Sequence, residues 1–374
     1  MAKNNDLRSA RVARKDEFYT QLTDIEKEMR YYRKHFKGKT VLCNCDDPFE
    51  SNFFKYFVLN FNRLGLKKLI ATCYATSPIM GQQLSLFDVV GGDEDKKGKP
   101  YKAVVTKVYD VTGDGGVDMF DVAELFKSHE NQLAELYGDG DFRSEECLAL
   151  LDEADIVVTN PPFSLFREYV ATLMEHDKKF IIIGNVNAVT YKEFFPLIRD
   201  NKVWIGASIH SGDRKFYVPD DYPLNAAGCG VDDAGRRFIR VKGVRWFTNL
   251  DLKQRHEELI LVRRYNPDDY PPFDNYEGIN VNKTVDIPCD YDGIMGVPIT
   301  FLDKYSPDQF EILGITCRGY SPEYRTKTYD KSEYKNANDL NGSGCILVDG
   351  KPKMIYGRVL IRNKHPEQPK EVQQ

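Results

Sequence analysis

One short stretch of the chain carries residue types suited to a specific chemistry, the transfer of a group to a planar NH2. The run from Ile156 to Thr159 contains only β-favouring residues, and it is followed directly by Asn160, Pro161, Pro162 and Phe163. Proline fixes φ and has no N–H, so the strand ends here and its last carbonyl oxygens stay free to accept hydrogen bonds. The Asn160 side-chain oxygen and the Pro161 carbonyl oxygen could accept both hydrogens of an aromatic amine, directing its lone pair at an activated methyl group. Phe163 would stack on the ring, and such stacking contributes on the order of 1 to 3 kcal/mol per base.

The same tetrapeptide could also be a plain turn after a strand, because Asn tolerates turn geometry and Pro ends a β-ladder. Its context favours a ligand site. The preceding strand is short and wholly apolar, as in a buried parallel sheet, and Ser164 is placed to cap a helix. That helix would carry on one side Leu165, Tyr169, Leu173 and Met174. A loop between a strand and a helix is where open α/β sheets bind ligands.

The elements before this stretch alternate in the manner of an α/β fold. The spacing predicts a helix over 23–37 that starts with the capping box Thr23-x-x-Glu26 and ends at Gly38. A strand is expected over 40–45, an apolar helix ending at Gly65, and a second strand over 67–72. This β-α-β order predicts a right-handed crossover and a parallel sheet.

An acidic, Gly-containing insertion is expected at about 77–137, with a strand over 102–109 and a helix over 122–136. Six residues inside it have the spacing of an EF-hand calcium loop: Asp110, Thr112, Asp114, Gly115, Asp118 and Asp121. However, a strand precedes them instead of a helix, and the last is Asp where a bidentate Glu is usual. A plain Asp/Gly turn is the favoured interpretation, and no metal site is predicted.

Further elements follow the tetrapeptide. A buried strand is expected over 180–184, and Thr190-x-x-Glu193 should cap a helix running to about residue 200. Asn185 and Asn187 leave the carboxyl end of that strand, so they could face the same cleft or only satisfy a polar loop. Two strands over 244–250 and 259–264 should form an antiparallel hairpin at the sheet edge. After residue 265 no helix is expected before Asp303.

Length and composition limit the class of protein. The chain has 374 residues, enough for one large domain and a smaller one. Its eight cysteines form no metal-ligand framework and read as reduced thiols of a cytoplasmic protein. No apolar run reaches membrane-spanning length, and the polar, mixed-charge residues 1–15 predict neither a signal peptide nor an anchor.

Charge is unevenly distributed around the net value of -5. Residues 88–155 hold 18 acids and 7 bases, whereas residues 1–40 carry 11 bases against 6 acids. The ranges 199–264 and 318–364 are also basic, with 13 against 9 and 10 against 5. A DNA-facing surface built from these basic ranges is therefore possible, although mixed charge runs are more often solvated faces. Five arginines could read guanine edges or only hold phosphates, namely Arg236, Arg237, Arg240, Arg318 and Arg325.

Four motifs in order make the chain resemble the EcoRI-type adenine-specific DNA methyltransferases. They are Asp16-Glu17-Phe18-Tyr19-Thr20, the strand Val41 to Cys45 with Asp46-Asp47-Pro48, the run Gly138 to Ser144, and Asn160 to Phe163. Further similar stretches, such as Trp246 to Leu250 and Met295 to Thr300, extend the resemblance over most of residues 16–315.

The resemblance implies a Rossmann-like methyltransferase sheet that binds S-adenosylmethionine. It implies that Phe18, Tyr19 and Thr20 border the methionine end of this cofactor, that Asp46, Asp47 and Pro48 form the loop under it, and that Asp141 and Phe142 contact its adenine. Two departures affect the cofactor contacts: the first loop has no Gly-x-Gly, and the second strand ends without a ribose-binding carboxylate. Asp46 and Asp47 could instead cap the next helix.

The expected architecture is an N-terminal arm and helix (1–38), a catalytic domain (39–264, with the insertion at about 77–137) and a smaller C-terminal target-recognition region (265–374). The leading hypothesis is an adenine-N6 methyltransferase acting on a flipped base in double-stranded DNA. The chain is expected to work as a monomer without a membrane, and a cognate restriction endonuclease could accompany it without a stable complex. The alternatives are methylation of an RNA base or of a protein glutamine, or a DNA-binding specificity protein without catalysis.

Overall fold

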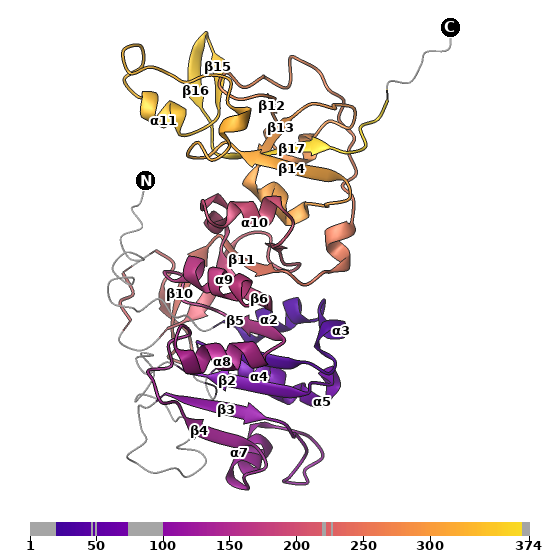
Figure 1. Ribbon diagram of the computed structural model, residues 1–374, viewed down its shortest axis with the longest axis vertical. Helices are drawn as coiled ribbons and strands as arrows, with labels where there is room; N and C mark the ends of the chain where they lie inside the picture. Colours follow the sequence, from indigo (N-terminus) through magenta and orange to yellow (C-terminus); the bar gives the residue numbers. More distant parts are fainter. Residues whose placement is uncertain are drawn as a thin grey trace. The chain divides into compact units, whose positions relative to one another are not determined.

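The computed structural model describes residues 20–45, 48, 51–73, 100–218, 222–225 and 227–368. The chain divides into two compact units (Figure 1). Unit 1 contains residues 1–186 and 206–250, and unit 2 contains residues 187–205 and 251–374. Among the described residues, no helix has the length and apolar character that crossing a membrane requires.

Unit 1 is built on a mixed sheet with the strand order β4-β3-β2-β1-β5-β6-β11. The strands are β1 (Thr40–Cys43), β2 (Lys68–Thr72), β3 (Tyr101–Val105), β4 (Gln132–Glu135), β5 (Ile156–Thr159), β6 (Lys179–Asn185) and β11 (Val244–Thr248). The four central strands β2, β1, β5 and β6 run parallel to one another, whereas β3, β4 and β11 pair antiparallel at the sides. Every residue of β1 and β5 is buried, as a parallel strand covered on both faces requires. The predicted α/β, Rossmann-like class is confirmed.

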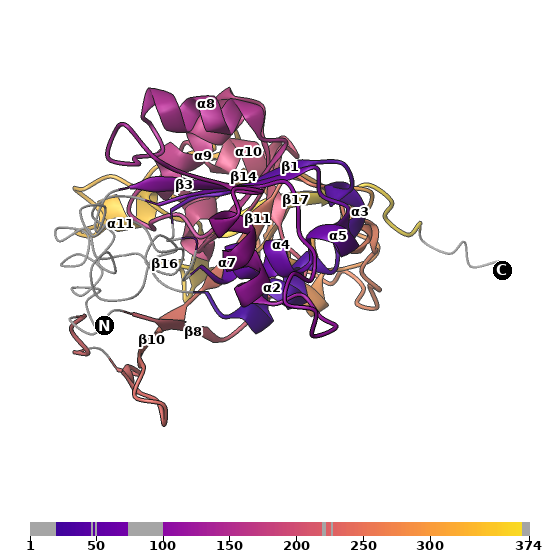
Figure 2. The ribbon, with the colours of Figure 1, turned by 90° about the horizontal axis from the view of Figure 1, so that it is seen from below.

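Helices cover both faces of this sheet. Figure 2 shows α8 (Glu145–Glu153) and α9 (Phe166–Glu175) on one face, and α2 (Leu22–Met29), α4 (Asn52–Leu59) and α7 (Met119–Lys127) on the other. The short helix α3 (Arg33–Phe36) precedes β1, and α5 (Phe61–Leu64) completes the crossover from β1 to β2. Helix α5 ends at Gly65, which has the left-handed φ of 65° that favours glycine at this position.

The first predicted helix starts within one residue of the expected position, but it is shorter and its predicted cap is wrong. Helix α2 begins at Leu22 with Gln21 as N-cap and no side-chain cap, so the capping box at Thr23 does not form. Between α2 and α3, the amides of Tyr31 and Tyr32 donate to carbonyls three residues back, a tighter turn than an α-helix. Beside this break lies the buried Glu28, whose carboxylate accepts from the Tyr32 hydroxyl at 2.7 Å and from two amides of the distant 207–208 segment.

The predicted helix over 122–136 is also wrong. Helix α7 ends at Lys127, and the chain returns as strand β4 after a turn in which His129 has a φ of 61°. The Asn131 side chain holds this turn, since it accepts from the Thr106 amide at 2.9 Å and donates to the Lys107 carbonyl at 2.9 Å. The helical spacing of apolar residues continues across this turn. Residues 132–135 nevertheless pair with β3 as a strand and do not extend the helix.

Three predicted elements after the tetrapeptide also differ from the structure: the starts of two helices and one strand. Helix α9 begins at Phe166 with Leu165 as N-cap, so Ser164 is not the cap. Thr190 ends the 3-10 helix η2 (Val186–Thr190), and α10 (Phe195–Arg199) begins only after Phe194. Residues 259–264 form no strand, because the Gln309 side chain bonds both the amide and the carbonyl of Leu259.

Strand β11 therefore pairs with β6 and not with residues 259–264. Before it lies a small antiparallel sheet of unit 1, in the order β8 (Asp213–Tyr217), β10 (Arg237–Lys242) and β9 (Gly230–Val231). Gly243, with a φ of 74°, turns the chain from β10 into β11.

Unit 2 has less regular structure. A four-stranded sheet has the order β12 (Ile279–Asn280), β13 (Met295–Pro298), β17 (Arg358–Asn363) and β14 (Phe310–Ile315). A separate hairpin is formed by β15 (Cys345–Val348) and β16 (Lys351–Met354). The remaining elements are β7 (Trp204–Ile205), α10, α11 (Ala337–Asn341) and the 3-10 helices η3 (Lys253–His256), η4 (Thr284–Asp286), η5 (Ile299–Lys304) and η6 (Pro322–Tyr324).

Candidate active site

The candidate site lies at the carboxyl ends of two central strands of unit 1. Strands β1 and β5 are parallel neighbours with Val41 opposite Ile156 and Leu42 opposite Val157. The loop after β1 and the tetrapeptide 160–163 therefore leave the sheet at the same edge. Asn160 is only 3% exposed and Pro161 is buried, whereas Pro162 and Phe163 are half-buried. The tetrapeptide thus combines a buried amide with an aromatic ring that solvent reaches.

Asn44 ties this edge together. Its backbone carbonyl accepts a hydrogen bond from the Thr159 hydroxyl, and its side-chain oxygen accepts one from the Tyr169 hydroxyl. Tyr169 is fully buried on α9, and burial raises the pKa of its hydroxyl well above the usual value, so the group stays a neutral donor. The loop after β1, the end of β5 and helix α9 are held in a fixed relation by these two bonds.

The Gly138 to Ser144 stretch reaches the same edge through Phe142. The Phe142 ring meets the Tyr169 ring edge-on, with centroids 5.0 Å apart. Arg143 pairs with Asp141 at 2.6 Å and with Glu168 of α9 at 3.0 Å. The structure therefore brings three motifs together, and it directs the Asp141 carboxylate toward Arg143.

The N-terminal motif meets the start of α4. The Thr20 carbonyl accepts from the Asn52 side chain at 2.7 Å, and Thr20 is only 3% exposed. Its hydroxyl oxygen is buried and has no hydrogen-bond partner among the described residues. A buried hydroxyl of this kind ordinarily has a partner, so its position suits a polar ligand atom beyond the start of α4.

Four of the residues predicted to bind the cofactor, Phe18, Tyr19, Asp46 and Asp47, lie outside the described residues, while Pro48 is described and buried. Helix α4 is capped by Ser51, whose side chain accepts from the Phe54 amide at 3.4 Å. The cap of this helix is thus supplied by a residue other than the two aspartates.

Gly184 in strand β6 sets the position of α9, a role that the sequence motifs did not predict. A Cβ at Gly184 would lie 2.4 Å from the ring of Phe166, the first residue of α9. Phe166 is only 3% exposed and packs against Phe247 of β11 with ring centroids 5.5 Å apart. Because α9 follows the tetrapeptide directly, the absence of a side chain at Gly184 fixes where that loop ends. A glycine inside a buried strand is a signal of such close approach.

Two other predicted features are explained by local hydrogen bonding. The Asn185 side chain donates to the Lys242 carbonyl at 2.9 Å, which agrees with loop satisfaction. In the 110–121 loop, the Asp110 carboxylate accepts from the amides of Gly113 and Gly115, and Asp121 accepts from those of Val111, Thr112 and Asp118. The described part of the chain contains no group of three His, Cys, Asp or Glu that could hold a metal ion.

The chain matches known proteins over nearly its whole length. The profile of the family described as adenine-specific methyltransferase EcoRI matches residues 6–364. Type II methyltransferase M.EcoRI of Escherichia coli is 44% identical over 366 residues, 97% of this chain and 98% of that protein. Type II methyltransferase M.MpnI of Mycoplasma pneumoniae is 34% identical over 364 residues, 95% and 97% of the two chains. Type II methyltransferase M.MgeORF184P of Mycoplasma genitalium is 35% identical over 359 residues, 95% and 98% of the two chains.

No solved structure matches the chain significantly. The resemblance that the four motifs predicted is confirmed by these relatives. The chain belongs to the EcoRI family of adenine-specific methyltransferases.

Proposed function

We propose that this protein methylates N6 of an adenine in duplex DNA, with S-adenosylmethionine as the methyl donor. One observation supports this most strongly: Asn160 is buried at the end of β5, at the edge where the Gly138 to Ser144 motif and the loop after β1 also meet. A stacked and paired adenine cannot reach this edge. The base must therefore leave the helix, at a cost of a few kcal/mol.

The residues of the tetrapeptide have separate roles in this proposal. The Asn160 side-chain oxygen and the Pro161 carbonyl oxygen accept the two amine hydrogens, and so hold the nitrogen lone pair away from conjugation with the ring. Phe163, which is half-buried, stacks on the base. Pro162 keeps the loop from continuing as a strand. No strong base is needed, because the amine proton becomes acidic once the methyl group is attached.

The cofactor would be held by the neighbouring motifs. Thr20, with its buried and unsatisfied hydroxyl, and Pro48 border the start of α4, and Phe142 lies against Tyr169. Phe18, Tyr19, Asp46, Asp47 and Asp141 complete the proposed set. S-adenosylmethionine supplies an electrophilic methyl group on sulfur when bound. The chain's own part is to position the amine and to exclude water from the edge where the motifs meet. Residues 265–374 are proposed to recognise the DNA target.

Product analysis tests this function. The purified protein is incubated with labelled S-adenosylmethionine and, separately, with duplex DNA, RNA and a glutamine-containing protein, and the products are digested and identified by mass spectrometry. We expect N6-methyladenine in duplex DNA alone. A methylated RNA base or glutamine amide as the main product would contradict the proposal, as would DNA binding without measurable cofactor affinity in calorimetry.

A further inference from the structure

In the β15–β16 hairpin of unit 2, the two residue pairs nearest the turn are mostly exposed. The opposite end of the hairpin, at Cys345, is buried and is called its root. The strands pair antiparallel with Cys345 opposite Met354 and Val348 opposite Lys351. Asp349 and Gly350 form the turn with φ of 50° and 73°, as a type I′ two-residue turn requires. At the root Cys345 is fully buried and its pair Met354 is 49% exposed, whereas Leu347 and Val348 nearer the turn are 53% and 39% exposed.

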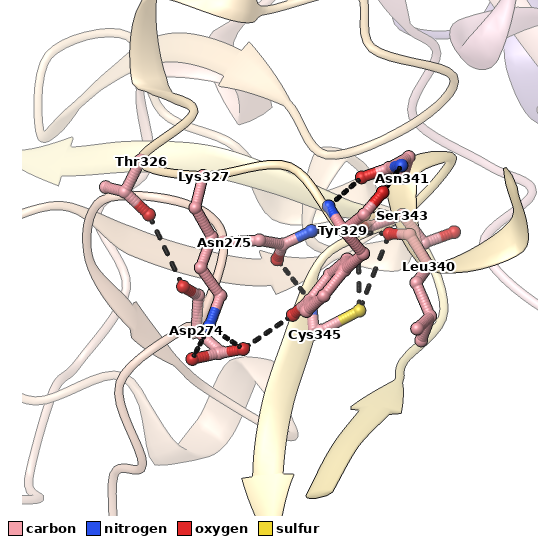
Figure 3. Close-up of polar contacts among 9 residues, drawn as sticks. All are labelled: Asp274, Asn275, Thr326, Lys327, Tyr329, Leu340, Asn341, Ser343 and Cys345. Carbon is pink, nitrogen blue, oxygen red and sulfur yellow. Dashed lines mark hydrogen bonds and ion pairs between the residues drawn. The ribbon is translucent and has the colours of Figure 1, made fainter. Parts of the chain in front are cut away.

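A buried amide holds the root of this hairpin. Asn275 is 0% exposed, and its side chain accepts from the Cys345 amide at 2.8 Å (Figure 3). The same side chain donates to the carbonyls of Ser343 at 2.9 Å and Leu340 at 3.3 Å. The Cys345 amide has this amide oxygen as its partner, whereas the two carbonyls also accept weaker bonds from the Cys345 thiol, so Asn275 makes the strongest tie that holds the root in position.

A second set of contacts supports the root from the other side. The Asp274 carboxylate accepts from the Tyr329 hydroxyl at 2.7 Å and pairs with Lys327 at 2.6 Å (Figure 3). Tyr329 packs with Cys345, Ala337 and Leu340 in one buried cluster. The exposed tip is therefore carried on a rigid base, as a preorganised binding element requires.

Four lysines on and beside this hairpin have no side-chain partner among the residues that the structure describes. Lys351 and Lys353 lie on one face of the hairpin, opposite Val348 and Ile346. Lys331 lies three residues before Tyr334 and Lys335 directly after it, and Tyr334 packs against the cluster that contains Cys345. All four are exposed, and within the described ranges none of them forms an ion pair or a side-chain hydrogen bond.

Four of the five arginines that the sequence offered as DNA contacts also have partners within the protein. Arg236 pairs with Asp232 at 2.9 Å, and Arg240 pairs with Asp213 at 3.2 Å. Arg237 donates to the Tyr222 carbonyl and Arg325 to the Asn341 carbonyl. Cations that already have partners gain less from a phosphate, so the lysines around β16 are better placed for one.

Exposed lysines usually only face solvent, so their charge alone does not indicate a DNA contact. The shape of the hairpin must support that contact as well. A two-stranded ribbon fits the major groove of duplex DNA, which is about 12 Å wide. Pro352 on β16 has no N–H to offer, which weakens the pairing of a further strand along that edge. Nearly fully exposed, Tyr356 follows β16 and adds an aromatic ring to the same stretch.

We propose that the β15–β16 hairpin enters a groove of duplex DNA, with Lys351 and Lys353 contacting phosphates. This inference rests on the proposed function, because that function supplies the duplex. The hairpin would then be the part of unit 2 that holds the target during methyl transfer.

Salt-dependent binding tests the inference. Affinity for a short duplex that the wild-type protein methylates is measured by fluorescence anisotropy over a range of NaCl concentrations, in the presence of sinefungin. For Lys351→Ala/Lys353→Ala we expect the slope of log K against log salt to fall by about 2, since each phosphate contact contributes about 0.9. The rate of methyl transfer at saturating DNA should stay unchanged.

Two controls sharpen the result. Lys283→Ala/Lys304→Ala removes the same charge from exposed positions of the same unit and should leave the slope unchanged. Asp349→Asn removes the acid at the hairpin tip, while Asn still tolerates the positive φ, and should strengthen binding.

An unchanged slope in the hairpin variant, an equal loss in the control variant, or unchanged or weaker binding in Asp349→Asn would overturn the inference. If the wild-type protein methylates DNA and the hairpin variant binds as the wild type does, only the inference fails. If the wild-type protein neither binds nor methylates duplex DNA, the proposed function fails with it.

Discussion

Each unit of this protein contains a buried asparagine that holds an important loop, and the two differ in what they connect. Asn44, 8% exposed, joins the end of β5 to α9, both of which already satisfy their backbones in a ladder or a helix. Asn275, 0% exposed, supplies hydrogen bonds to the backbone of residues 340, 343 and 345, where the end of α11 leads into β15. In unit 1 the Asn44 side chain adds a hydrogen bond between elements whose backbones are already paired. In unit 2 the Asn275 side chain itself supplies backbone hydrogen bonds that regular secondary structure does not provide.

The largest expected effect is on catalysis at the edge of unit 1. Asn160→Ala removes one of the two proposed amine acceptors while the rest of the scaffold remains. If its loss compares with that of an oxyanion-hole donor, the rate falls by roughly 10² to 10³. Single-turnover methylation of DNA measures this rate. Near-normal turnover in a folded variant would refute the assigned role of Asn160.

In unit 2 the largest expected effect is on stability. Asn275→Ala leaves the Cys345 amide buried without a partner and removes one bond from each of two carbonyls, which at about 1 kcal/mol for each lost bond lowers the free energy of unfolding by roughly 2 to 3 kcal/mol. Hydrogen exchange should become faster at residues 340–348 while kcat on saturating DNA is kept. Asn338→Ala is the matched control, because that side chain is exposed and makes no side-chain hydrogen bond among the described residues. Equal exchange in the two variants would show that the root does not depend on Asn275.

In unit 1 the scaffold can be disturbed by a substitution at Gly184 of strand β6. Gly184→Ala places a methyl group where the Phe166 ring lies, and relief of such overpacking costs typically 1 to 3 kcal/mol. Displacement of α9 should lower both the melting temperature and the rate of methylation. Gly116→Ala, where the nearest atom is 4.0 Å from the added Cβ, should change neither. A double variant Gly184→Ala/Phe166→Leu should recover part of the loss, and no recovery would place the cause elsewhere.

A smaller effect is expected at the link between Asn44 and Tyr169. Tyr169→Phe removes one buried hydrogen bond, worth about 1 kcal/mol, and leaves the backbone of the scaffold intact. We expect a severalfold weaker affinity for S-adenosylmethionine in calorimetry, since the loop after β1 is less firmly held. Tyr137→Phe is the control, because Tyr137 is 100% exposed. Unchanged cofactor affinity in Tyr169→Phe would separate Asn44 from the cofactor site.

The difference between the units also decides what the sequence could predict. Strands β1, β2, β5 and β6 were anticipated within a few residues, because buried parallel strands are continuous apolar runs. The site residues 160–163 followed from the same run. The links made by Asn44 and Gly184 were missed, since they depend on which side chains approach across the sheet.

In unit 2 the pattern carried less information. Residues 259–264 read as a strand, yet the Gln309 side chain takes the place of a neighbouring strand at Leu259. Likewise the hairpin root depends on Asn275, which is distant in sequence from the residues it bonds. Where side chains replace ladder hydrogen bonds, local periodicity does not determine the fold.

The smallest expected effect concerns a surface cluster of unit 2 that has no buried network. His256 lies between Asp251 at 2.9 Å and Asp308 at 2.7 Å, and its hydrogen bonds to these carboxylates raise the pKa of the ring above its usual 6.5. Its stabilising contribution is therefore full below pH 6.5 and is lost as pH rises through the raised pKa. Burial raises the pKa of Asp251, but its hydrogen bond to His256 helps to bring that pKa below its usual value. The stabilisation that depends on the ionised Asp251 is therefore lost as the solution becomes strongly acidic.

The contribution of His256 should thus be greatest in mildly acidic solution. Because the His256 side chain is 40% exposed, salt screens the pair and the effect stays small. We expect His256→Asn to lower the melting temperature by a degree or two at about pH 6 and by nothing measurable at pH 9. His365→Asn, an exposed histidine of the same unit with no carboxylate partner in the described ranges, should show no such difference. An effect in His256→Asn as large as that of Asn275→Ala would mean that surface pairs, and not the buried amide, hold unit 2 together.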